Sequence, residues 1–254
     1  LSILVDLLSY NTHYLSYIAN MSTNEIFLDS ADVRNNIVSL AKMIGYTPSS
    51  VRAPRASVNI LVNNATGNSL TMNKATVFTS TVDGASYQYV NNEDISITPE
   101  NGVYTFANVT LYEGTPITFK YTYDSNDTDQ RFLIPSSNAD TSTLKVSVQT
   151  SSTDSSSATY SLADGYSSLD GDSKVYFIEE VEDGKFRIYF GDGVTGKKLD
   201  NGNIIILEYI VTNTTDSNGA STFTLSGNIN GFSDVTITTN SVSSGGAVAE
   251  SNAS

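Results

Sequence analysis

The stretch from Lys185 to Tyr209 reads Lys-Phe-Arg-Ile-Tyr-Phe-Gly-Asp-Gly-Val-Thr-Gly-Lys-Lys-Leu-Asp-Asn-Gly-Asn-Ile-Ile-Ile-Leu-Glu-Tyr and decides the fold of the second half of the chain. Its first residues place Phe186, Ile188 and Phe190 at every second position, which predicts a β-strand. The run 204–211 is rich in β-branched residues and apolar on both faces, which predicts a central strand covered on both sides. A glycine-rich segment connects the two strands.

This glycine-rich segment carries two patterns found in nucleotide-binding loops, G-x-G-x-x-G and G-x-x-x-x-G-K. Either pattern binds phosphate only when a helix follows the glycines. Here residues 200–202 predict another turn, and Lys198 stands where a P-loop has Ser or Thr. A nucleotide-binding enzyme is therefore the least favoured function. We expect a backbone turn or an inter-subunit loop at Gly191, Asp192, Gly193, Gly196 and Gly202.

Residues 1–47 predict a pair of helices. In the first helix, apolar side chains recur at spacings of three and four, and further apolar side chains occupy much of the remaining circumference. For the second helix we predict Asp29 or Ser30 as N-cap and Gly45 just past the C-terminus, with Pro48 preventing continuation. Its apolar stripe is predicted at Val33, Ile37, Leu40, Ala41 and Ile44.

Two helices cannot cover this much apolar surface by contacting only each other. Either the β region folds back over the first helix, or helices of other subunits do. We favour the second alternative, because a helix that is apolar on most sides needs partners on most sides. The predicted subunit interface consists of Leu1, Leu4, Leu8, Tyr14, Leu15 and Ile18.

From about residue 54 the pattern becomes β, with alternation at Val58, Ile60 and Val62 and with Asn-Gly and Asp-Gly dipeptides suited to hairpin turns. The clearest hairpin joins 175–181 to 185–190, and the serine-rich stretch 150–159 predicts a flexible loop or a domain boundary. The predicted fold is α+β: an N-terminal helical pair, then a mainly antiparallel β region in two subdomains. The predicted units are 1–47, 54–150, 151–240 and a linker, 241–254, to a further domain. Further strands are predicted at 75–80, 103–109, 118–123, 144–150, 203–212, 221–226 and 234–239.

The chain is poorly equipped for catalysis. It has no cysteine and a single histidine, His13, which we interpret as a packed or hydrogen-bonded side chain on the apolar helix. A calcium loop at 124–135 would need glycine at its sixth position and glutamate at its twelfth, where Asp129 and Pro135 stand. We predict no enzyme activity, no catalytic or metal site, no cofactor and no small-molecule substrate.

The formal net charge of −14 argues against nucleic acid and anionic membrane as partners, because both would repel this chain. The sequence contains no run of about 18 apolar residues, so it predicts no membrane-spanning helix. An acidic, β-rich surface adhesin or binding module is the alternative function that composition leaves open.

Two regions together resemble one family of phage proteins. The run Tyr189-Phe-Gly-Asp-Gly, Gly196, Asn201-Gly-Asn-Ile and Tyr209 is similar to the signature of the baseplate J-like family of contractile-tailed phages, as is 243–251. The opening, at 4–14, 24–30 and 41–48, resembles one branch, the large ring-forming baseplate wedge subunits of T-even-like myophages. The chain departs from many family members by lacking a proline near Leu199, and 81–170 matches only in general character.

The resemblance implies a non-enzymatic structural protein of the virion, assembled in the host cytoplasm and located in the tail baseplate. It implies a homodimer whose N-terminal helices bundle with those of another wedge protein. Wedges would join in a ring around the tail hub, and the ring would relay the conformational change that triggers sheath contraction. It also implies sequence before Leu1 and after Ser254.

Overall fold

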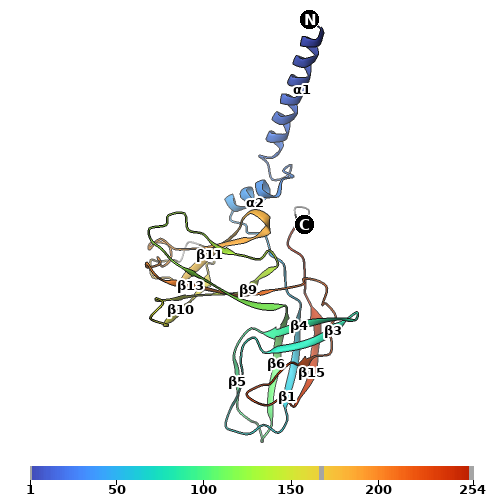
Figure 1. Cartoon of the computed structure of the whole chain (residues 1–254), viewed down its shortest axis with the longest axis vertical. Helices are drawn as coiled ribbons and strands as arrows, with labels where there is room; N and C mark the ends of the chain where they lie inside the picture. Colours follow the sequence, from blue (N-terminus) through green and yellow to red (C-terminus); the bar gives the residue numbers. More distant parts are fainter. Residues whose placement is uncertain (1, 166–168, 252–254) are drawn as a thin grey trace.

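The computed structural model describes residues 2–165 and 169–251. Helix α1 (Ser2–Asn24) extends away from the rest of the chain, helix α2 (Arg34–Met43) lies at its base, and two β regions follow (Figure 1). The predicted α+β class and the helical pair are confirmed. Neither described helix is both long enough and apolar enough to span a lipid bilayer.

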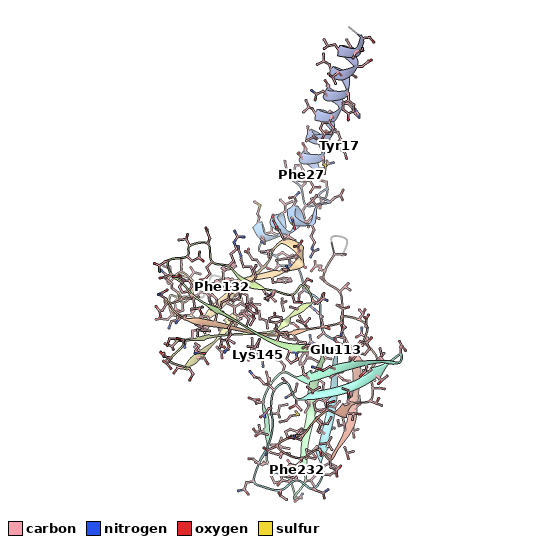
Figure 2. The ribbon with its side chains drawn as sticks, in the orientation of Figure 1. Tyr17, Phe27, Glu113, Phe132, Lys145 and Phe232 are labelled. Atoms are coloured by element: carbon pink, nitrogen blue, oxygen red, sulfur yellow. The ribbon has the colours of Figure 1, made fainter. Side chains whose placement is uncertain are left out.

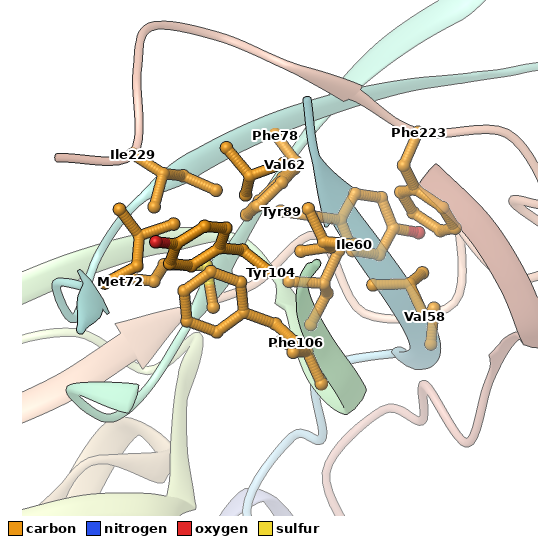
Figure 3. Close-up of a cluster of buried hydrophobic side chains, with 14 of the residues drawn as sticks. Val58, Ile60, Val62, Met72, Phe78, Tyr89, Tyr104, Phe106, Phe223 and Ile229 are labelled. Atoms are coloured by element: carbon orange, nitrogen blue, oxygen red, sulfur yellow. The ribbon is translucent and has the colours of Figure 1, made fainter. Parts of the chain in front are cut away.

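The first β region is built on a six-stranded sheet in the order β14-β3-β4-β6-β1-β15, with a two-stranded sheet, β2-β5, beside it. Its core gathers apolar side chains from both sheets and from the segment that returns after residue 212, including Phe106, Tyr89 and Phe223 (Figure 3). The strands are β1 Arg55–Val62, β2 Leu70–Met72, β3 Val77–Val82, β4 Ala85–Asn91, β5 Ile95–Ile97, β6 Tyr104–Glu113, β14 Thr224–Leu225 and β15 Val235–Ser244.

The second β region is a seven-stranded sheet in the order β7-β13-β9-β10-β11-β12-β8, with its own core around Ile205, Leu207 and Ile188. Its strand pairs are antiparallel except for β10 with β11. The strands are β7 Thr115–Thr122, β8 Phe132–Ile134, β9 Ala139–Gln149, β10 Ser157–Leu162, β11 Val175–Glu180, β12 Phe186–Phe190 and β13 Ile204–Val211.

The division between the β regions differs from the predicted one. The predicted boundary at 150–151 falls between β9 and β10, which are neighbours in one sheet. Instead, the second β region is inserted into the first, because β1 pairs with β15 on one side and with β6 on the other. The predicted linker 241–254 begins inside β15, and Ala247 bridges to Arg52; residues 252–254 lie outside the described residues.

Most strands predicted from alternation are present. The hairpin of β11 and β12 is confirmed, with Val181 N–H donating to the Lys185 carbonyl at 2.8 Å around its turn. Strand β13 is central, between β7 and β9, but only one of its faces is fully buried, and Glu208 on the other face pairs with Lys74. The prediction that 150–159 is a flexible loop was wrong at its end, where β10 begins at Ser157.

Strands β2, β4, β5, β8 and β10 were not predicted. Three of them have only three residues, too few to establish a period of two. Strand β4 reads Ala-Ser-Tyr-Gln-Tyr-Val-Asn, in which Tyr87 and Tyr89 flank Gln88, so its alternation is present in the sequence but was missed.

Helix α2 begins later than predicted. Its N-cap is Val33, which offers no side-chain oxygen, so neither Asp29 nor Ser30 caps it. The carboxylate of Glu25 instead holds the segment that leads into the helix, by accepting hydrogen bonds from the Asp32 N–H at 3.0 Å and from the Asn36 side chain at 2.8 Å. These donors, Asn36 first, hold the pKa of Glu25 below its usual value. The C-terminus is as predicted, with Gly45 at positive φ and Tyr46 N–H bonded to the Ala41 carbonyl.

Helix α2 is fixed to the second β region by charge pairs and by two small apolar side chains. Arg34 binds Glu180 through two hydrogen bonds of 2.8 and 2.9 Å, and Lys42 lies 3.2 Å from Glu179. Val38 and Ala41 are the buried positions. The predicted stripe is therefore rotated: Ala41 is buried, Ile37 and Leu40 are half-buried, and Val33 and Ile44 are exposed.

The two β regions are joined where the chain passes between them twice. Glu113, completely buried at the end of β6, accepts hydrogen bonds from Thr212 Oγ1 at 2.6 Å, Asn213 N at 3.0 Å and Asn213 Nδ2 at 2.7 Å. Asp140, also buried, accepts from the Ala53 N–H at 2.8 Å. Buried carboxylates need such donors, because an unpaired charge in the interior is strongly unfavourable.

Gly114 lies between β6 and β7, and substituting it tests how closely the two crossing segments pack. It has φ of 125°, and a Cβ there would lie 2.3 Å from the Val211 carbonyl oxygen. Gly227 has the same φ of 125° with no atom within 4 Å. We expect Gly114→Ala to lower the free energy of unfolding by about 3 kcal/mol or more, and Gly227→Ala by about 1–2 kcal/mol, in urea denaturation. Equal losses in the two variants would contradict the close packing at the junction.

Candidate subunit interface

Helix α1 contacts neither β region. None of its described residues is buried, and its side chains project from an isolated rod (Figure 2). The alternative in which the β region folds back over this helix is therefore not what the structure shows. The interpretation of His13 as a packed or hydrogen-bonded side chain is not met within this chain: His13 is exposed, as are the other described residues of α1, and it lies on one side of the helix with Ser2, Ser9 and Asn20.

The apolar side chains of α1 form two adjacent rows. In the first row each residue follows the last by four or three positions, and in the second row the same spacing holds, shifted by one residue. This alternation of four and three is the heptad spacing by which helices pack side chains into one another's grooves. The first row is Ile3, Leu7, Tyr10, Tyr14, Tyr17 and Met21; the second is Leu4, Leu8, Asn11, Leu15, Ile18 and Ser22.

The predicted interface residues fall into these rows. Leu4, Leu8, Leu15 and Ile18 share the second row and are 41–60% exposed, whereas Tyr14 lies in the first row and stacks on Tyr10 with ring centroids 6.5 Å apart. Leu1 lies outside the described residues. The other members of the first row were not among the predicted interface residues, although their spacing in the sequence carries the same signal.

Leaving these rows in water is costly. Full burial of a Leu, Ile or Tyr-sized apolar side chain stabilises by about 1.5–3 kcal/mol. Burying both rows against other helices would therefore contribute more than about 10 kcal/mol of hydrophobic free energy. The apolar surface continues below α1 through Ile26, Phe27 and Leu28, all exposed. An arc this wide, with two heptad rows side by side, fits contact with two neighbouring helices rather than one.

The glycine segment after β12 is a closed loop, and no helix follows it. Every backbone N–H from residue 193 to residue 197 is already bonded within the protein. Asp192 accepts from Val194 and Thr195, both at 2.9 Å, and the other three bond to carbonyls of Gly196, Asp170 and Ser173. A phosphate would need these same donors. The loop therefore has no free cradle for a nucleotide.

Glycine is required at different positions of this loop for different physical reasons. A Cβ at Gly191 would lie 2.2 Å from the carbonyl carbon of Gly196, whereas Gly193, Gly196 and Gly202 adopt positive φ. Asp192 is the acceptor that holds the turn, and the hydrogen bonds from Thr195 and Val194 hold the pKa of its carboxyl below the usual value. The segment 191–202 is thus a braced turn. Within the described residues no group of three His, Asp or Glu side chains could hold a metal ion.

Comparison with known proteins supports the resemblance seen in the sequence. The chain is similar to "Baseplate wedge protein gp6" of Enterobacteria phage T4, with 27% identity over 260 residues. The match covers 94% of this chain and 38% of that protein, so the chain spans about two fifths of the length of the curated relative it matches. The resemblance to wedge subunits of T-even-like phages is confirmed by this relative. No family model matches the chain, so the baseplate J-like signature stays a prediction.

Substitutions at Gly191 and Gly202 distinguish a steric clash from an unfavourable backbone conformation as the cause of destabilisation. Gly202 has φ of 85° and no atom within 4 Å of a Cβ. We expect Gly191→Ala to reduce the free energy of unfolding by about 2–4 kcal/mol because the Gly196 backbone must move, and Gly202→Ala by about 1 kcal/mol through backbone strain alone. Thermal denaturation followed by circular dichroism measures both. A Gly191→Ala variant as stable as the wild type would show that the loop is not braced.

Proposed function

We propose that this chain is a non-enzymatic structural part of a contractile phage tail, located in a baseplate wedge. The observation that carries the proposal is the similarity to a baseplate wedge protein over nearly the whole chain, together with a protruding helix that this chain itself leaves uncovered. The chemistry of the sequence agrees, because the chain has no cysteine nucleophile and its single histidine is exposed.

In the proposed assembly, α1 joins a helical bundle. One heptad row contacts the same helix of a second copy, and the adjacent row contacts a helix of a different wedge subunit. Two different neighbours account for two rows of different composition: the first carries three tyrosines, whereas the second is mainly aliphatic with Asn11 and Ser22. A polar residue within such a row fixes the register of a bundle at some cost in stability.

The proposal extends to how a baseplate changes shape. Wedges carrying this chain would form the ring around the hub, and a displacement of the bundle would reach the β regions through α2. The Glu25 bonds at the start of α2 and the Arg34–Glu180 pair on its inner side give a short mechanical connection from α1 to β11. The β regions then move with α2, relaying the change that triggers sheath contraction.

Location is tested by gold-labelled antibody against this chain on purified contractile-tailed particles, viewed by electron microscopy. The expected result is label at the distal end of the tail, where the baseplate lies. Label absent from particles but present on cell surfaces would overturn the proposal in favour of a surface adhesin.

The bundle is tested by matched pairs of substitutions one heptad apart. We expect Leu8→Glu with Leu15→Glu to abolish co-purification of the chain with other wedge subunits, because two charges would enter a buried row. Ser9→Glu with Ser16→Glu adds the same charges at the same spacing on the polar side of α1 and should leave co-purification intact. Equal behaviour of the two variants would rule out the bundle.

A further inference from the structure

The second β region contains a small hollow that the proposed bundle does not use. It has a volume of about 290 Å³ and lies where β8, the end of β12 and the glycine loop meet. Its apolar lining includes Phe132, Ile188 and Leu199, all buried, and Phe190, half-buried. Figure 2 marks Phe132 within this region. The volume is at the lower end of the range for ligand pockets, so the hollow fits one or two side chains rather than a nucleotide.

Three cations surround this apolar lining: Arg131, Arg187 and Lys198. Among the lining residues only Asp192 is acidic, and one oxygen of its carboxylate accepts hydrogen bonds from two backbone N–H groups of the glycine loop. The chain as a whole has 13 Lys and Arg against 27 Asp and Glu. The lining of the hollow therefore carries an excess of positive charge, whereas the chain as a whole is negatively charged.

These cations are incompletely paired within the described residues. Arg131 and Lys198 are exposed and form no ion pair there. Arg187 bonds Glu179 through Nη2, while its Nε is buried without a hydrogen-bond partner. Arg187 thus already has a carboxylate partner in this chain, which leaves Arg131 and Lys198 as the cations available to an incoming carboxylate.

We propose that this hollow binds an extended segment of another protein chain in which Asp or Glu stands beside an aromatic or aliphatic residue. The apolar side chain enters the hollow beside Phe132 and Phe190, which pack edge to face with ring centroids 5.9 Å apart, and the neighbouring carboxylates meet Arg131 and Lys198. Charge complementarity selects an acidic occupant. The carboxylates of such a segment are attracted to cations of this chain that have no carboxylate partner of their own. This gives the glycine loop a second role, as one wall of a docking site.

A fluorescein-labelled peptide of alternating glutamate and phenylalanine tests the site by fluorescence anisotropy with the whole chain. We expect binding that weakens as salt rises, and no binding of the twin peptide with glutamine at every glutamate. Arg131→Glu with Lys198→Glu should weaken binding about tenfold or more. Lys120→Glu with Lys174→Glu, which changes two exposed lysines that do not line the hollow, should leave it unchanged.

Three results would overturn the proposal. The first is equal binding of the glutamate and glutamine peptides, and the second is equal loss in the two double variants. The third is dimerisation of the wild type, but not of the Arg131→Glu, Lys198→Glu variant, in sedimentation velocity, which would assign the hollow to a second copy. The outcome does not depend on α1, so failure here and failure of the proposed bundle are distinguishable.

Discussion

The buried carboxylate of Glu113 is the constraint on which the arrangement of the two β regions depends. It sits where the chain leaves the first region and accepts three hydrogen bonds from Thr212 and Asn213, where the chain returns. An unpaired carboxylate at this depth would be strongly destabilising, so both crossings must stay together. Gly114 allows the two crossing segments to approach within contact, since any side chain there would meet the Val211 carbonyl. Two separate cores are thereby held in one orientation.

The molecule divides into parts that bury their own apolar surface and a part that does not. Each β region has a complete core, with Phe106 and Leu207 fully buried. Helix α1, in contrast, buries none of its described residues. The apolar surface of α1 is therefore the part of the molecule from which association could still gain free energy by burial. Helix α2 connects the exposed helix α1 to the β regions, because Arg34 of α2 forms an ion pair with Glu180 on β11.

The glycine loop shows why a motif needs its structural context. The pattern at 191–197 has the spacing of a nucleotide-binding loop, yet every backbone N–H from residue 193 to residue 197 is bonded to another group of the protein. What the loop offers its surroundings is a wall beside Phe190 and the unpaired Lys198. Recognition of a peptide side chain suits such a surface better than recognition of a phosphate, because the available donors are side chains around an apolar hollow.

Local patterns in the sequence determined the elements whose stability is local. The alternation in β1 and β12, the β-branched run of β13, the Asp183-Gly184 turn, the helical spacing of α1 and the glycine at the end of α2 were all predictable from spacing and turn chemistry. The uncovered rows of α1 were readable in the same way, since a surplus of apolar positions on a helix is a property of the sequence. Tertiary structure alone decided the pairing of β1 with β15, the insertion of one β region into the other, the burial of Glu113 and Asp140, and the meeting of Arg131 with Lys198. Those features depend on which distant segments come together, and no local period encodes that choice.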